Sequence, residues 1–202
     1  MRQITSVGLL VSFLGAGGGI ALGLQGASRA TIQGKVTCRG VRDCNGAVVF
    51  IESLPGRSFS PASNRVMDQL NLTFVPHVLP VVVGTQVAFP NSDEVRHNVF
   101  SPSPVKRFNL GTYPKGVTKH VVFDKPGIVE LLCNVHAEMS AYVVVTETPH
   151  WVLVGKDGTY VLKDVPTGSY VLRAWREELK DQRQEVTVRE GESLTVNFEL
   201  RR

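Results

Sequence analysis

The sequence predicts an all-β fold of sandwich or barrel type. Short segments rich in β-branched and aromatic residues recur along the chain, and many alternate apolar with polar positions, as in TKHVVF (118–123) and QEVTVRE (184–190). Turn-forming triplets separate these segments, for example KDG (156–158). Helical periodicity is scarce, since the helix-compatible stretch WREELKDQRQ (175–184) lacks an apolar stripe. Together these observations favour packed β-sheets over a helical fold.

The expected strands fall into three groups along the chain. A polar linker at 55–65 and a boundary near 146–149 isolate a middle unit, 64–148. The end unit, 150–202, is small for an independent core, and residues 31–54 are the natural source of partner strands for it. The expected strands are, in chain order, 32–38, 46–52, 71–83, 85–90, 97–101, 118–123, 128–133, 141–147, 159–165, 169–175, 184–190 and 194–200.

Residues 1–30 have the composition of a secretory signal peptide. Arg2 precedes a long uncharged stretch rich in Gly, Ala and Leu, and the small residues Ser28 and Ala30 fit a cleavage site after Ala30. The alternative is an uncleaved anchor, because the stretch is almost long enough to cross a bilayer. Cleavage predicts a periplasmic or secreted protein with no membrane span in its mature form.

The charge of the chain does not indicate nucleic-acid binding. The formal net charge is +4, from 22 Lys and Arg against 18 Asp and Glu. Removal of 1–30 takes away Arg2 and Arg29 and no acids, so that 20 bases face 18 acids and the net charge becomes +2. A nearly neutral chain without a run of basic residues lacks the electrostatic pattern of nucleic-acid-binding proteins.

The three cysteines divide into a pair and a single residue. Cys38 and Cys44 lie in the turn-rich segment TCRGVRDCNG, where an oxidising compartment allows them to close a small disulfide loop. Two free thiols are the alternative. Cys133 then has no partner, and an unpaired thiol in an oxidising compartment suggests a specific task.

Cys133 begins a cluster of three candidate metal ligands in LLCNVHAEMSAY (131–142). Thiolate and thioether select soft metals, and copper accepts both together with imidazole. Two His, one Cys and a distant axial Met form the blue-copper donor set. Cys133, His136 and Met139 supply three of these donors from one loop between two expected strands. His97, which follows the turn NSDEV, is the best candidate for the fourth.

Other chemistries fit this loop less well. Zinc accepts Cys and His, but Met is not among its usual ligands. Covalent haem attachment needs C-x-x-C-H, which the sequence lacks. A nucleophilic pair of Cys133 and His136 leaves Met139 without a role. The plainest alternative makes Cys133 and Met139 core residues and His136 a surface residue.

Residues 64–148 resemble the cupredoxins, the small blue-copper proteins with a Greek-key β-sandwich. The resemblance rests on NLTFVPHVLPVVVGTQVAFPNSDEVRHNVFS and on FDKPGIVELLCNVHAEM, whose C-x-x-H-x-x-M spacing is that of the short, amicyanin-like ligand loop. It implies that His97, Cys133, His136 and Met139 bind one type 1 copper ion. It also implies that Asn98 helps to join the two ligand-bearing segments.

The mature chain as a whole resembles exported bacterial proteins of the plastocyanin-like or methylamine-utilisation type. In these proteins a cupredoxin accompanies a carboxypeptidase-regulatory-like, transthyretin-like β-sandwich. GKDGTYVLKDVPTGSYVLRAW is similar to the second part of that domain, and IQGKVTCRGVRDCNGAVVFIE to its first two strands. The resemblance implies that the cupredoxin is inserted between the two parts.

The resemblance implies a periplasmic single-electron carrier and not an enzyme. The expected partners are a c-type cytochrome or a periplasmic dehydrogenase. Leu132 and Asn134 flank the cysteine where plastocyanin has an aromatic residue, so exchange is expected through His136, beside Ala137, Pro102 or Phe100. The alternative function is copper binding or trafficking, or an envelope interaction protein without redox turnover.

The remaining candidate residues are expected to have structural roles. His77 is interpreted as a strand-edge or interface residue in preference to a replacement ligand, because four ligands already fill the site. Glu138 is a possible hard ligand, but Met139 fits the donor pattern better. The residues expected at the surface are His120 and His150, and those expected in the core of the end unit are Trp151 and Trp175.

Overall fold

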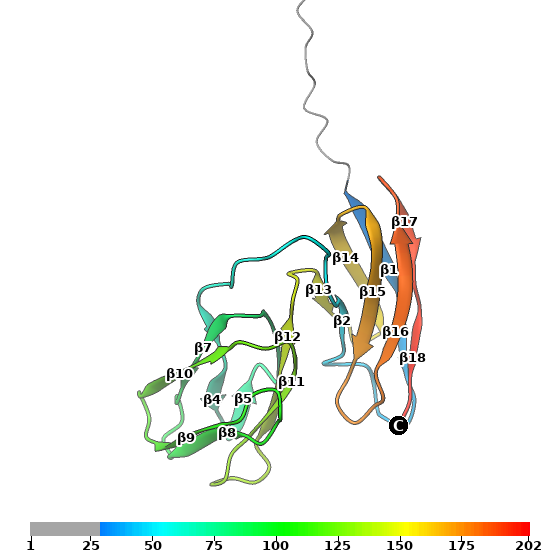
Figure 1. Ribbon diagram of the computed structural model, residues 1–202. Coiled ribbons are helices and arrows are strands. Elements are labelled where there is room, and N and C mark those ends of the chain that lie inside the picture. The colour runs from blue at the N-terminus through cyan, green and yellow to red at the C-terminus, as the bar shows by residue number, and fades with distance from the viewer. Residues whose placement is uncertain (1–28) are drawn as a thin grey trace, which may run out of the picture.

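The computed structural model describes residues 29–202 and contains two β-sandwiches (Figure 1). The prediction of an all-β fold is confirmed, since the regular elements of the described residues are strands throughout. Nothing between residues 29 and 202 forms a helix with the length and apolar character needed to span a membrane. The predicted signal segment lies almost wholly outside the described residues. Its expected last residue, Ala30, begins strand β1 and is buried.

The first sandwich, called the insert sandwich below, contains β3 to β12. One sheet has the order β10-β7-β3 and the other β6-β12-β11-β8-β9, with the hairpin β4-β5 beside them. The bounds are β3 (Arg65–Val66), β4 (Asp68–Leu70), β5 (Thr73–Val75), β6 (Val78–Val82), β7 (Thr85–Pro90), β8 (His97–Ser101), β9 (Phe108–Tyr113), β10 (Thr118–Phe123), β11 (Gly127–Leu132) and β12 (Ser140–Thr146).

The inward positions of these strands form one apolar core. Alternation in β7 and β10 places Val87, Phe89, Val121 and Phe123 on the buried face, as the period of two in a strand requires. Cys133 and Met139 belong to the same buried cluster. The loop 133–139, which carries the candidate ligands and is called the ligand loop below, is therefore anchored on the core of the insert sandwich.

The second sandwich, called the host sandwich below, combines the two ends of the described chain. β1 pairs with β14, β17 and β18, and the other sheet has the order β13-β2-β15-β16. The chain leaves this sandwich after β2 and returns to it at β13. The bounds are β1 (Ala30–Cys38), β2 (Val48–Ile51), β13 (Trp151–Leu153), β14 (Thr159–Val165), β15 (Gly168–Trp175), β16 (Gln182–Val188), β17 (Ser193–Thr195) and β18 (Phe198–Leu200).

Several strands differ from their expected extents for identifiable reasons. The expected strand 71–83 is divided into β5 and β6 at Pro76 and His77, because proline cannot donate to a ladder. Pro80 is accommodated because β6 is the edge strand of its sheet. The expected strand 194–200 is likewise divided, into β17 and β18. Strand β9 is not among the expected strands, because its FNLGTY pattern is interrupted by Gly111, and neither are the short strands β3, β4 and β13.

The two sandwiches pack against each other through a separate apolar cluster. It joins Val48, Phe50 and Trp175 of the host sandwich to Val78 and Val144 of the insert sandwich, all of them buried. Tyr142 lies beside Trp175, with ring centroids 5.2 Å apart. Trp175 was expected in the core of the end unit, but its ring packs at the interface between the two sandwiches. This contact connects the host sandwich to β12, the strand that follows the ligand loop.

The disulfide between Cys38 and Cys44 closes a short loop after β1. Chain-entropy arguments give about 2 kcal/mol of stabilisation for so small a loop. We expect the double substitution Cys38→Ser/Cys44→Ser to lower the unfolding free energy by about this amount in urea titrations. Reductant should destabilise the wild-type protein similarly and leave the variant unchanged. An equal response of both proteins would contradict the assignment.

Candidate metal centre

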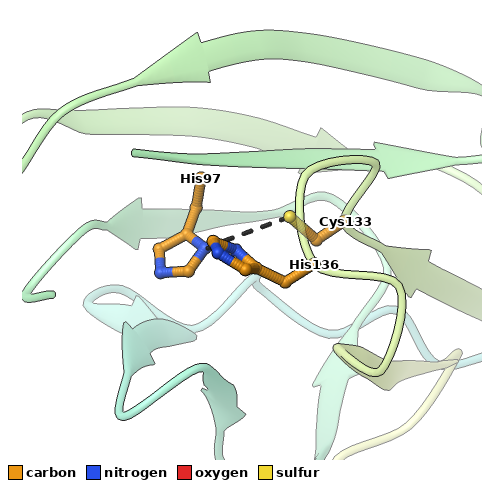
Figure 2. A group of neighbouring side chains, drawn as sticks. All are labelled: His97, Cys133 and His136. Atoms are coloured by element: carbon orange, nitrogen blue, oxygen red, sulfur yellow. Dashed lines mark hydrogen bonds between the residues drawn. The ribbon is translucent and has the colours of Figure 1, made fainter. Parts of the chain in front are cut away.

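Three potential ligands from two segments converge at one end of the insert sandwich. His97 begins β8, whereas Cys133 and His136 lie in the loop between β11 and β12 (Figure 2). The Nδ1 atoms of His97 and His136 are 3.1 Å apart, and the Cys133 Sγ lies 4.0 Å from the His97 Nδ1. The ligand atoms of all three residues lie within 4.8 Å of one another.

This arrangement fits a single ion. Metal–nitrogen bonds of about 2.0–2.1 Å and metal–sulfur bonds of about 2.3 Å allow separations up to about 4.1 Å between two nitrogens and about 4.4 Å between nitrogen and sulfur. The 3.1 Å and 4.0 Å separations lie within these limits, and the third pair, Cys133 and His136, lies within 4.8 Å. Two imidazole nitrogens this close need a proton or a cation between them, because their lone pairs repel. Small side-chain adjustments would bring all three donors onto one ion.

Met139 is held close to the other ligands by the backbone of the loop. The Met139 N–H donates to the His136 carbonyl at 3.1 Å, and the Cys133 N–H donates to the Met139 carbonyl at 3.3 Å. Its side chain is buried in the same apolar cluster as Cys133. Glu138, the alternative hard donor, is exposed. The loop thus offers soft donors toward the core and turns its carboxylate to solvent, which suits copper.

Asp93 fixes the orientation of His97. The Nε2 of His97 lies 2.8 Å from Asp93 Oδ2, and a carboxylate can only accept, so this nitrogen carries the proton. In a neutral ring Nδ1 is then free of its proton and points at Cys133 and His136. His97 is fully buried. Asp93 therefore sets the tautomer that metal binding at Nδ1 requires.

Asp93 is in turn held by the tip of the hairpin β4-β5. The backbone N–H groups of Asn71 and Leu72 donate to its carboxylate at 2.6 and 2.9 Å. Both residues have positive φ, at 55° and 58°, as a two-residue hairpin turn requires. Burial raises the pKa of Asp93, but the hydrogen bonds from Leu72, His97 and Asn71 outweigh it and lower the pKa below its ordinary value. Asp93 is thus anionic at neutral pH.

Asp93 is a part of the site that the sequence pattern does not indicate. NSD (91–93) predicts only a turn, and the spacing of four residues between Asp93 and His97 is the one local signal for their contact. Asn71 and Leu72 lie more than twenty residues away, and their contact with Asp93 depends on the hairpin β4-β5, whose second strand falls within the single expected strand 71–83.

His136 is half-buried and lies at the edge of the site that faces solvent. Of the neighbours expected beside it, Ala137 and Pro102 are exposed and Phe100 is half-buried. The segments around the cluster carry further exposed apolar side chains. These are Leu72, Val95 and Val135, which are 49%, 44% and 46% exposed. The segments that carry the cluster thus expose apolar side chains together with the charged Glu94, Arg96 and Glu138.

Asn98 makes a different contact from the one that was expected. Its Nδ2 donates to the Asn109 Oδ1 at 2.9 Å, which joins β8 to β9. No bond from this side chain to the loop 133–139 is found among the described residues, and its buried Oδ1 has no hydrogen-bond partner there. A bulge between Asn98 and Phe100 alters the local pairing and brings Asn109 within reach. Asn98 therefore positions β8 and does not join the two ligand-bearing segments.

The other histidines lie outside the cluster. His77 lies at the interface between the sandwiches, as the preferred interpretation had it, and contacts Ser140 and Glu177. His120 is exposed on β10. His150 packs edge-on against Phe59, and burial lowers its pKa, with Arg29 and Arg57 adding to the effect. Trp151 lies at the rim of the interface cluster.

Fold and site together define an all-β protein of two sandwiches in which one cysteine and two histidines, all potential metal ligands, cluster near a buried Met. A family model described as carboxypeptidase regulatory-like domain matches residues 137–201, which cover β12 to β18. A search of curated proteins finds no match.

Among solved structures, an amicyanin variant in its reduced form is similar at 25% identity and a TM-score of 0.39, over 43% of this chain and 91% of that one. A purple cupredoxin from Nitrosopumilus maritimus is similar at 23% identity and a TM-score of 0.39, and the match covers 41% of this chain and 100% of that one. A copper-containing nitrite reductase from Thermus scotoductus SA-01 is similar at 23% identity and a TM-score of 0.41, and the match covers 48% of this chain and 25% of that one.

Proposed function

We propose that this protein is a type 1 copper protein that carries single electrons and catalyses no reaction of its own. The observation that carries the proposal is the convergence of His97, Cys133 and His136 within 4.8 Å, with the buried Met139 in the same loop. The donor set of two imidazoles, one thiolate and a thioether is that of blue-copper sites. The bound copper would supply a one-electron couple between its two oxidation states.

The side chains hold this donor set in a fixed geometry. His97 is buried and oriented by Asp93, and Cys133 is fixed at the end of β11 by the Met139 carbonyl. A site held by packed strands changes little between two oxidation states, which keeps the cost of rearrangement low. His136 is the ligand nearest to solvent, so its ring edge is the proposed point of electron exchange.

The decisive experiment is the addition of Cu(II) to the purified mature protein. An intense blue band from thiolate-to-copper charge transfer is expected, with one copper bound per chain. The band should disappear in Cys133→Ala, while Cys38→Ser/Cys44→Ser should retain it. Folded wild-type protein that binds no copper, or binds it without this band, would refute the proposal.

The surface next to the half-buried His136, which includes the exposed Ala137, is the proposed docking site for the redox partner. We expect Ala137→Glu to slow electron self-exchange by about tenfold, because two like charges then meet in the encounter complex. Val161→Glu, an equivalent change at an exposed position of β14 in the host sandwich, is the control. Self-exchange rates from NMR line broadening measure the effect. Equal rates in both variants would place the exchange site elsewhere.

The proposed location is the periplasm or the cell exterior. The charge and composition of residues 1–30 and the disulfide between Cys38 and Cys44 support export to an oxidising compartment. The proposed partners are soluble redox proteins of that compartment, such as a c-type cytochrome or a dehydrogenase.

A further inference from the structure

His77 links the two sandwiches at the rim of their interface. It lies between β5 and β6 of the insert sandwich, and its Nε2 is 2.9 Å from both carboxylate oxygens of Glu177 in the host sandwich. Its Nδ1 is 3.0 Å from the Ser140 carbonyl oxygen. Glu177 lies in the connection between β15 and β16. One imidazole therefore bridges the host sandwich and the start of β12.

Both ring nitrogens of His77 face oxygen atoms that can accept a hydrogen bond. A carbonyl oxygen and a carboxylate accept hydrogen bonds and cannot donate them. A neutral imidazole carries one N–H, so only the imidazolium form makes both bonds. The carboxylate of Glu177 and the carbonyl of Ser140 thus hold the ring from its two nitrogen-bearing sides. The two bonds support each other, and loss of Glu177 weakens both.

The Ser140 carbonyl is directly connected to the ligand loop. Ser140 follows Met139, whose carbonyl accepts from the Cys133 N–H and whose N–H donates to His136. The backbone of His77 also accepts from the Tyr142 N–H at 2.9 Å, so His77 contacts β12 at two points. A displacement of Ser140 would therefore move Met139 through the peptide bond that joins them, and Cys133 through its hydrogen bond to the Met139 carbonyl.

The surroundings of His77 contain few other charged groups. The shallow pocket beside it is lined by Asp43, Arg176 and Glu177 as charged residues. Tyr142 packs edge-on at 5.8 Å between ring centroids. Burial, together with Glu130 and Glu177, raises the pKa of Tyr142 to about 12, so that this ring is neutral. Glu177 is thus the acid whose carboxylate contacts the His77 ring directly.

We propose that the host sandwich positions the ligand loop through the chain of contacts Glu177–His77–Ser140. His77 and Glu177 are positioning residues for Met139 and Cys133. As regards the metal, this inference rests on the proposed function. The pair lies at the rim of the interface, with side chains 46% and 25% exposed, whereas Val48, Val144 and Trp175 form its buried centre. The contact can therefore open while the sandwiches stay packed.

Residue-resolved amide exchange in the full-length, metal-free protein tests the proposal. In Glu177→Ala and His77→Ala, exchange at the Cys133 and Met139 amides is expected to be at least about tenfold faster than in the wild type. Glu177→Gln, which keeps an acceptor but loses the charge, should give a smaller acceleration. Amides at the centre of the interface, such as Val144, should retain their protection.

Two matched variants control for unspecific effects. Glu178→Ala removes the neighbouring acid, which pairs with Arg202 at 2.9 Å, and His120→Ala removes an exposed histidine of β10. Neither should change exchange in the ligand loop. Glu177→Ala could lower the melting temperature and yet leave the Cys133 and Met139 amides as protected as they are in Glu178→Ala. In that case Glu177 and His77 only join the sandwiches, and the proposal is wrong.

The copper form separates this proposal from the proposed function. In a protein with the blue band, Glu177→Ala and His77→Ala should shift the band and the reduction potential, whereas Glu178→Ala should not. Unchanged spectra and potentials would overturn the link to the metal. If the wild-type protein shows no blue band but the exchange effect is present, the copper function fails while the positioning of the loop by the host sandwich stands.

Discussion

Replacing Asp93 with asparagine is expected to weaken copper binding by about 10- to 100-fold. The carboxylate accepts the proton of the His97 Nε2 and thereby leaves Nδ1 free to bind. An amide of the same shape can turn its NH₂ group toward Nε2, which favours the tautomer with the proton on Nδ1. Loss of the negative charge should also raise the reduction potential, because it destabilises Cu(II) more than Cu(I). Chelator competition and voltammetry measure the two effects.

Glu94→Gln is the matched control for this substitution. Glu94 is the next residue, lies on the surface and pairs with Lys115, so its replacement removes the same charge without touching His97. Its copper affinity should match that of the wild-type protein. If Asp93→Asn and Glu94→Gln bind Cu(II) equally well, Asp93 does not control the His97 tautomer.

Gly34→Ala is expected to cost about 3 kcal/mol or more of unfolding free energy in the host sandwich. A Cβ at this position would lie 1.8 Å from the Val196 carbonyl oxygen, and a backbone atom cannot move aside as a flexible side chain can. Gly34 lies in β1 between its partners β14 and β17. Relief of the clash would therefore separate strands at the centre of a sheet.

Urea unfolding followed by the fluorescence of Trp151 and Trp175 measures this loss. Gln33→Ala, at an exposed position of the same strand, provides the control and should change stability by less than about 0.5 kcal/mol. A Gly34→Ala protein as stable as the control would show that β1 tolerates a side chain next to Val196.

The ligand loop was the most predictable part of the site, because its information is local. Cys133, His136 and Met139 lie within seven residues between two strands with clear β patterns, and chemistry alone connects them to a distant histidine. Alternation and turn residues likewise sufficed for the all-β fold. Boundaries were less predictable, as β5 and β6 show, since the break at Pro76 interrupts an otherwise continuous apolar run.

The roles of Asp93 and His77 were not predictable because they depend on tertiary neighbours. Asp93 gains its function from Asn71 and Leu72 at the tip of a hairpin, and His77 from Glu177, one hundred positions away. No local pattern marks either contact. Asn98 was expected to contact the ligand loop, but its side chain binds Asn109 instead. This partner likewise depends on tertiary structure, because a bulge in β8 brings Asn109 within reach.

The insertion of one sandwich into the other also constrains the order in which the chain folds. Strand β2 meets β13 through Phe50 and Trp151, and β1 meets β14 through Ile32 and Leu162, so these two host pairs close over roughly one hundred residues or more, although β15 and β16 form a local hairpin. The insert sandwich pairs strands much nearer in sequence, such as β11 with β12. Once it has formed, it brings the ends of β2 and β13 together and shortens the effective loop. We therefore expect the insert sandwich to fold first and to serve as the scaffold on which the host sandwich completes its sheets.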